Sequence, residues 1–134
     1  MKFELDTQDR YTQLSLHEEK LDTRIAPNLK QEFLVLNQRG TRNILLDMTH
    51  VSYADSSGLG AILMANRMCN NAGGIMVLAG VSTHVDRVIK ISMLDSVLNI
   101  YLTIDEAREA IFMNELESEI SDEISDEGSA DEIQ

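Results

Sequence analysis

The amino-acid sequence predicts an α/β sandwich, in which helices pack against a mixed but mostly parallel sheet, followed by a disordered acidic C-terminal tail. Two apolar segments that alternate with polar residues near the N-terminus predict an antiparallel hairpin. After the hairpin and a first helix, short apolar runs alternate three times with segments of helical periodicity, as in parallel sheets with crossover helices. The last part of the chain is acidic, lacks aromatic residues and repeats the letters ISDE, which is typical of segments that do not fold.

The first elements are the hairpin and one helix. The two strands begin near Phe3 and end near Leu16, and the polar letters DTQDR separate them. Pro27 is tolerated in the first turn of a helix, and Gly40 supplies a stop signal. The apolar residues between these two positions recur at helical spacing, so we expect a helix over residues 26–39.

Three strand–helix units follow. The apolar runs NILLDM, IMVLAG and LNIYL are short enough to be buried strands. Each is followed by apolar residues at helical spacing, and Thr103 with Glu106 forms a capping box before the last of these helices. The expected helices cover residues 56–70, 82–94 and 103–116.

The chain is expected to form one domain, residues 1–113, and a tail, residues 114–134. A chain of 134 residues with 43% hydrophobic content can build one core but not two ordinary domains. The tail holds nine acidic residues and no Lys or Arg, so we expect it to be solvated and disordered beyond about residue 116. In an alternative interpretation, Ile120 and Ile124 form one helical turn on a basic partner.

Composition limits the classes of partner and the compartment. The formal net charge of -12 argues against binding to nucleic acid or to an anionic membrane surface, because both need a basic footprint. The single cysteine, Cys69, offers no disulfide framework and suggests a reducing compartment. The charged start of the sequence lacks the apolar region of a signal peptide, and no apolar run approaches a membrane span. We therefore expect a cytoplasmic protein.

The most informative letters are YADSSGLGAIL, residues 53–63, where a loop that leaves the sheet turns into a helix. Asp and Ser are preferred N-cap residues, so helix capping alone explains part of this motif. One cap needs only one side chain, however, and Gly58 and Gly60 are unfavourable in a first helical turn. Such glycines allow another group to approach the backbone closely. Capping and a functional role are both open at this point.

The motif does not resemble a catalytic centre. A nucleophile elbow needs a glycine two residues before the serine, and neither Ser56 nor Ser57 has one. His17, His50 and His84 lie in separate segments without metal-ligand spacing, so neither a general base nor a metal site can be assigned. We expect a protein that is not an enzyme and that carries no metal or cofactor.

Phosphorylation is the better functional interpretation of the serines. A hydroxyl at an exposed helix start is accessible, and a phosphate there meets free backbone N–H groups. The added charge of about -1.5 to -2 beside Asp55 would repel an acidic or apolar partner surface. A surface that docks when it is neutral would then be switched off.

Residues 43–94, NILLDMTHVSYADSSGLGAILMANRMCNNAGGIMVLAGVSTHVDRVIKISML, resemble the core of a STAS domain (sulfate transporter and anti-sigma antagonist), in particular the stand-alone anti-sigma factor antagonists. The similarity covers roughly residues 3 to 113. In that family an anti-sigma factor that is a serine kinase phosphorylates the serine before the first glycine of the motif, a position that corresponds to Ser57. The resemblance implies that the unphosphorylated form binds this kinase and frees a sigma factor. Phosphorylation breaks the complex, and a metal-dependent serine phosphatase restores it.

The family also has a Gly-Glu-Leu-Asp loop after its second strand. The corresponding residues here are Glu19, Lys20, Leu21 and Asp22. Leu21 and Asp22 match the family, whereas Glu19 stands in place of the glycine and Lys20 in place of the glutamate. Asp22 is therefore either part of the docking surface or a helix cap ahead of Pro27.

The docking surface is expected to continue along the helix after the motif, which has two apolar sides instead of one. Met64 and Met68 on one side suit docking, because methionine adapts to partner surfaces, although for each methionine alone coverage by neighbouring helices is the favoured explanation. With Ser57 as the phosphoacceptor, the expected partner-binding residues are Asp22, Asp55, Ser56, Gly58, Leu59, Ala61, Met64 and Met68.

Two other functions fit the same fold. One is a constitutive scaffold or signalling-complex subunit that is never phosphorylated. The other is an accessory subunit of a lipid-transport complex, since stand-alone STAS domains also serve there. Ser57 favours the switch, because a permanent scaffold has less need for a hydroxyl at that position.

Overall fold

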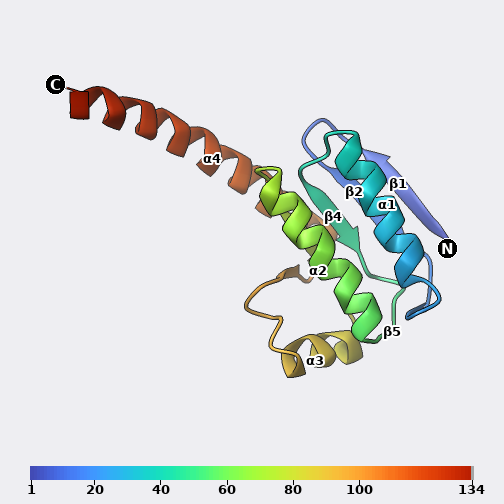
Figure 1. Cartoon of the computed structure of the whole chain (residues 1–134). Coiled ribbons are helices and arrows are strands. Elements are labelled where there is room, and N and C mark those ends of the chain that lie inside the picture. The colour runs from blue at the N-terminus through green and yellow to red at the C-terminus, as the bar shows by residue number, and fades with distance from the viewer. Residues whose placement is uncertain (134) are drawn as a thin grey trace.

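The computed structural model describes the backbone of residues 1–133 and the side chains of residues 1–123. This part of the chain has the predicted α/β fold, with a mixed sheet between helices (Figure 1). The main sheet has five strands in the order β1-β2-β4-β6-β7. These strands are β1 (Phe3–Thr7), β2 (Thr12–Leu16), β4 (Ile44–Asp47), β6 (Met76–Ala79) and β7 (Asn99–Tyr101). The helices are α1 (Ala26–Gln38), α2 (Ser56–Asn71), α3 (Thr83–Ile91) and α4 (Ile104–Ile133).

The pairing of the strands confirms a mixed but mostly parallel sheet. β1 runs antiparallel to β2, with Phe3 opposite Leu16, as expected for the predicted hairpin. The pairs β2–β4, β4–β6 and β6–β7 are all parallel. Parallel neighbours require crossover connections, which α1, α2 and α3 supply.

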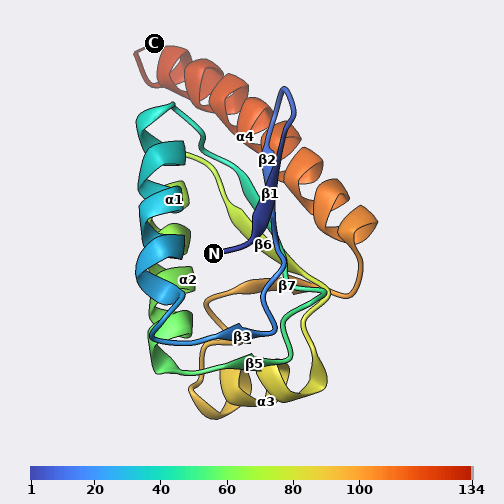
Figure 2. The same ribbon diagram turned by 90° about the vertical axis from the view of Figure 1, so that its right-hand side faces the viewer.

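Helices cover both faces of the sheet (Figure 2). α1 and α2 lie on one face, where the larger core contains Leu14, Leu46 and Leu78. α4 lies on the other face over a smaller core that contains Leu45 and Val77. The strand residues therefore alternate between the two cores, because successive side chains of a strand point to opposite faces.

A second, two-stranded sheet was not predicted. β3 (Lys20–Leu21) pairs in parallel with β5 (Tyr53–Ala54), beside the end of the main sheet where α2 begins (Figure 2). Strands of two residues are too short to show any periodicity in a sequence. This small sheet brings residues 19–22 next to the YADSSGLG motif, so it positions the candidate site.

α4 differs from the predicted helix in length. It starts one residue after Thr103 and continues to Ile133. The sequence, in contrast, indicated disorder beyond about residue 116. Its last part projects away from the sheet (Figure 1), and the side chains of residues 116–123 are all exposed. Glu115 is buried against the body. The side chains of residues 124–134, and the disorder expected for them, lie outside the described residues.

Candidate functional site

The start of α2 is capped by a single residue, Asp55. Its backbone is extended, and its carboxylate accepts a hydrogen bond from the backbone N–H of Gly58 at 3.0 Å. The carbonyl of Asp55 accepts the first intrahelical hydrogen bond, from Leu59 at 3.0 Å. The capping interpretation of Asp55 is therefore correct, and capping does not require either serine.

Ser56 and Ser57 occupy the first two positions of the helix. Ser56 is exposed and Ser57 is half-buried, and neither side chain forms a hydrogen bond within the described part of the chain. The backbone N–H groups of a first helical turn have no intrahelical acceptor, and the helix dipole makes this end positive. The first turn of α2 also contains no acidic residue. An anionic group on either serine would find a favourable electrostatic environment here.

Gly58 is needed because another part of the same chain approaches it. A Cβ atom built on Gly58 would collide with the backbone carbonyl oxygen of Leu21 and lie 2.7 Å from its Cγ. A Cβ on Gly60, in contrast, would have no heavy atom within 4 Å. The Leu21 carbonyl also accepts a hydrogen bond from the N–H of Asp55 at 3.2 Å. The group that approaches Gly58 is therefore Leu21 at the end of β3, directly before Asp22.

Asp22 holds the turn that leads into α1. Its carboxylate accepts hydrogen bonds from the backbone N–H and the side chain of Arg24, at 3.0 and 3.3 Å. Partial burial raises the pKa of Asp22, but the hydrogen bonds and the positive charge of Arg24 outweigh this effect and leave the pKa below its ordinary value. The N-cap of α1 is Ile25, which makes no side-chain cap hydrogen bond. Asp22 is thus a turn residue and not the cap that the sequence allowed.

A shallow hollow of about 250 Å³ separates the starts of α1 and α2. Ser57 lines it together with Thr23, Pro27 and Lys30. Lys30 is exposed, and it brings a positive charge to the rim of the hollow. Residues 23–30, which are distant from Ser57 in the sequence, therefore lie beside the serine side chain.

The sequence-predicted docking residues divide into two groups. Asp22, Asp55, Met64 and Met68 are half-buried, like Ser57, whereas Ser56 is exposed; both methionines also pack against the larger core. The other three are buried, namely Gly58, Leu59 and Ala61. A buried residue can shape this surface but cannot contact a partner without rearrangement.

Sequence reasoning missed an aromatic contact beside the motif. Tyr53, on β5, stacks on His84, on α3, with ring centroids 5.5 Å apart and an angle of 17° between the rings. Both side chains are exposed. The pair attaches α3 to the edge of the site, and its partners are too far apart in the sequence for any local signal.

The remaining candidate groups do not suggest catalysis. The rings of His17 and His50 lie 4.9 Å apart, a contact that the sequence did not indicate. Burial raises the pKa of the Cys69 thiol to about 12, so this residue is an unreactive buried side chain. Within the described residues, no three His, Cys, Asp or Glu side chains are grouped closely enough to hold a metal ion.

The fold is shared with solved structures of anti-sigma factor antagonists. An anti-sigma-factor antagonist (STAS) domain protein from Planctomyces limnophilus matches with a TM-score of 0.73 at 21% identity, over 81% of this chain and 97% of that one. The anti-sigma factor antagonist SpoIIAA in its unphosphorylated form matches with a TM-score of 0.70 at 22% identity, over 82% of this chain and 96% of that one. The phosphorylated form of SpoIIAA, from Bacillus, matches with a TM-score of 0.64 at 21% identity, over 82% of this chain and 99% of that one.

Sequence comparison agrees with the structural likeness. The anti-sigma-B factor antagonist of Staphylococcus aureus (strain NCTC 8325 / PS 47) is 29% identical over 100 residues, which are 75% of this chain and 92% of that protein. None of the described helices is both long and apolar enough to cross a membrane. Residues 2–107, which contain the whole site around Ser57, match the STAS domain, and the chain belongs to the STAS domain family.

Proposed function

We propose that this protein is an anti-sigma factor antagonist that works as a binding switch controlled by phosphorylation of Ser57. The unphosphorylated form binds an anti-sigma factor with serine kinase activity, and the sigma factor held by that kinase is released. Phosphorylation ends the binding, and a metal-dependent serine phosphatase restores it. In this proposal the protein acts in the cytoplasm and has no catalytic activity of its own.

The observation that carries the proposal is the Ser57 hydroxyl. Asp55 already caps the helix, so the local structure would form without this hydroxyl. The side chain is half-buried on the rim of a hollow, and a kinase could reach it there. Its relatives support the same function, because one is named an anti-sigma-B factor antagonist and SpoIIAA is described in both unphosphorylated and phosphorylated forms.

A phosphate would change this surface mainly through its charge. It adds about -1.5 to -2 charges and three acceptor oxygens at a point now occupied by a neutral hydroxyl. Arg24 pairs with Asp22, and Lys30 on the rim of the hollow offsets the negative charge of Asp55, so a phosphate would make a nearly balanced surface negative. A partner surface that fits the neutral form would then face repulsion and an additional desolvation cost.

The proposed docking surface uses the accessible residues of the site. Ser56 and the half-buried Asp22, Asp55, Met64 and Met68 would contact the kinase, with the methionines as its apolar part. Gly58, Leu59 and Ala61 would support this surface from beneath, because they are buried. Substitution of these three residues would reduce binding only by moving the surface.

The first experiment is phosphopeptide mass spectrometry on protein purified from its own host in several growth states. The tryptic fragment from Asn43 to Arg67 contains both serines of the motif, so fragmentation must locate the phosphate. We expect phosphate on Ser57, its loss in Ser57→Ala, and its retention in the matched control Ser56→Ala. Phosphate on Ser56 alone would contradict Ser57 as the phosphoacceptor, and persistent absence of phosphate with partners still bound would favour a constitutive scaffold or a transport subunit.

Binding measurements complete the test once the phosphorylated residue and the kinase have been identified. Ser57→Asp should weaken binding to the kinase by at least about tenfold, a cost of about 1.4 kcal/mol. Ser57→Ala should bind like the wild type and should not be released by ATP. If Ser57→Asp bound the kinase as tightly as the wild type, charge at this position would not be the switch.

A further inference from the structure

An apolar stripe follows the outer side of α4, at the end of the molecule opposite to Ser57. Phe112, Met113, Leu116 and Ile120 are between 44% and 54% exposed. At about 100° per residue they fall within one sector of the helix. Ala107, Ile111 and Glu115 lie on another side of α4 and are buried. Because α4 projects beyond the sheet (Figure 1), the far end of the stripe is not covered by the body of the protein.

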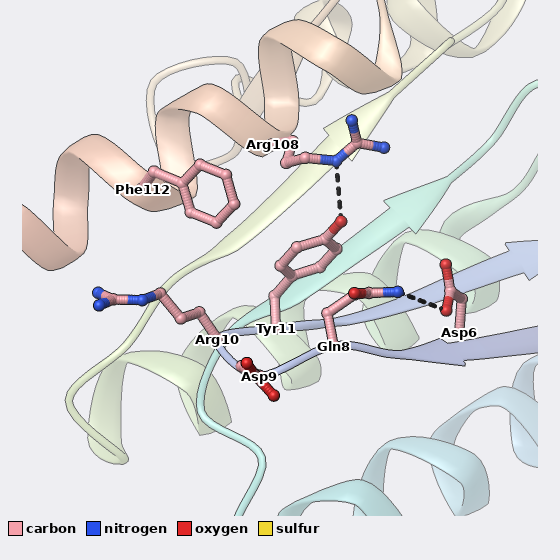
Figure 3. Close-up of a pocket in the computed structure, with 7 residues that line it drawn as sticks. All are labelled: Asp6, Gln8, Asp9, Arg10, Tyr11, Arg108 and Phe112. Carbon is pink, nitrogen blue, oxygen red and sulfur yellow. Dashed lines mark hydrogen bonds between the residues drawn. The ribbon is translucent and has the colours of Figure 1, made fainter.

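One end of the stripe borders an open cavity of about 420 Å³. Figure 3 shows the rings of Phe112, on α4, and Tyr11, after the β1–β2 turn, next to one another in the lining of this cavity. The ring centroids are 6.1 Å apart at an angle of 66°. Arg108 donates a hydrogen bond to the Tyr11 hydroxyl at 2.8 Å, which holds the tyrosine ring in place. The two rings are thus in edge-to-face contact and form one apolar wall of the cavity, on which a side chain of a partner could pack.

Acidic side chains surround the stripe. On α4 the carboxylates of Glu109, Glu117 and Glu123 lie around the stripe on exposed positions, and Glu119 pairs with Arg10 at 3.6 Å. The cavity itself is lined by two acids and two arginines, namely Asp6, Asp9, Arg10 and Arg108, so the excess of negative charge lies along α4. Burial of the stripe therefore favours a partner that brings apolar side chains together with positive charge.

From this arrangement we propose that the α4 stripe and the cavity form a second docking surface, whose occupant is a basic amphipathic helix of another protein. One apolar residue of that helix enters the cavity and packs against the Tyr11–Phe112 pair, and others lie along Leu116 and Ile120. Its Lys and Arg side chains pair with the surrounding glutamates. A second copy of this chain would be a poor occupant, because the same acids would face each other. The surface shares no residue with the Ser57 site and does not depend on the function proposed for it.

Peptide binding to the full-length protein tests this proposal. The probe is a fluorescent helical peptide of about 18 residues that contains only Leu and Lys, with leucines at i, i+3, i+4 and i+7. A peptide with the same composition in scrambled order, which has no apolar face, is the control for charge alone. We expect the amphipathic peptide to bind more tightly in an anisotropy titration, with an affinity that decreases as salt increases.

The stripe itself is tested by Leu116→Glu combined with Ile120→Glu. The double variant should bind the peptide at least about tenfold more weakly, since the apolar contacts are lost. The matched control is Leu34→Glu on α1, at 42% exposure on the other face of the sheet, which should bind within about twofold of the wild type. Equal binding by the double variant and the control would overturn the proposal.

The role of the charges is tested with two pairs of substitutions that change the net charge by the same amount. Glu117→Gln with Glu123→Gln should weaken peptide binding more than Glu4→Gln with Glu32→Gln, which removes two acids outside α4. If the two pairs weakened binding equally, the peptide would be responding to overall charge, and the proposal would fail. Light scattering on the wild type is the remaining check, because a dimer abolished by Leu116→Glu with Ile120→Glu would make a second copy the occupant.

Discussion

The two ends of the sheet are held together by different kinds of interaction. At the Ser57 end, the contacts are made by the backbone: the Leu21 carbonyl lies against Gly58 and accepts the N–H of Asp55. At the opposite end, a carboxylate, an amide and a guanidinium fasten α4 to the sheet. The first end can therefore change its surface charge through Ser57 without breaking its own framework. The second end depends on one charged side chain.

That side chain is Glu115. Its carboxylate accepts hydrogen bonds from Asn43 at 2.6 Å and from Arg42 at 2.8 Å, and it is buried. Asn43 in turn donates to the carbonyl of Arg10 at 2.9 Å and accepts from the N–H of Ile75 at 2.9 Å. α4, the hairpin turn and the beginnings of β4 and β6 thus meet at one polar cluster.

The largest expected effect therefore comes from Glu115→Ala. It leaves the buried Asn43 amide and the Arg42 guanidinium without their acceptor, which should lower the free energy of unfolding by about 3 kcal/mol. Urea unfolding followed by far-UV circular dichroism measures this, since the chain contains no Trp. Hydrogen exchange should also become faster in α4 and remain unchanged at the start of α2.

Glu119→Ala is the matched control for Glu115→Ala. Glu119 is on the same helix as Glu115, and the substitution removes its exposed ion pair with Arg10. The free energy of unfolding should fall by less than about 0.5 kcal/mol. Equal losses from the two variants would mean that burial of Glu115 contributes nothing, and the contrast between the two ends would be lost.

The next effect tests the backbone contacts at the other end. Gly58→Ala places a methyl group against the Leu21 carbonyl, and we expect a loss of about 2 kcal/mol from overpacking, measured in the same unfolding experiment. Gly60→Ala is the natural comparison, since its Cβ would meet nothing within 4 Å. It should stabilise the protein by about 0.5–1 kcal/mol through helix propensity alone. Stabilisation by both substitutions would contradict a close approach at Gly58.

These pairs of residues also show how far the sequence could predict the fold. Pro27 and Gly40 mark the ends of α1 through their local conformational preferences, and the helix was predicted within one residue. β3 and β5 were missed because two residues carry no period. Glu115 was placed with the tail because its neighbours are acidic, whereas its partners Arg42 and Asn43 are distant in the sequence.

The candidate site was predictable to the same extent. The motif indicated a helix start with an accessible serine, because capping follows from residue type and local spacing. The sequence could not distinguish the two glycines, since only the folded chain brings Leu21 against Gly58 and leaves Gly60 open. The Tyr53–His84 stack and the hollow beside Lys30 likewise depend on segments that only the fold brings together.

The smallest expected effect concerns the charge that the Ser57 end does contain, on Asp22. The pKa of Asp22 lies below its ordinary value of 3.8, because the Arg24 hydrogen bonds outweigh the effect of burial. Its contribution to stability is therefore fully present above that ordinary value and is lost as the pH falls through the lower pKa of the folded state. Asp22→Asn should melt at a slightly lower temperature than the wild type at neutral pH, and this difference should vanish at strongly acidic pH.

Thermal melts followed by circular dichroism from neutral pH down to about pH 2 measure this difference. The control is Asp9→Asn, which removes an exposed carboxylate from the hairpin turn. Its melting temperature should not show this pH-dependent difference from the wild type. The charge difference between aspartate and asparagine disappears when the aspartate is protonated. A melting-temperature difference between Asp22→Asn and the wild type that stays constant with pH would therefore assign the role of Asp22 to turn geometry. The carboxylate of Asp55, which caps α2, would then be the charged group that holds the Ser57 end, and a phosphate on Ser57 would add its charge beside that cap.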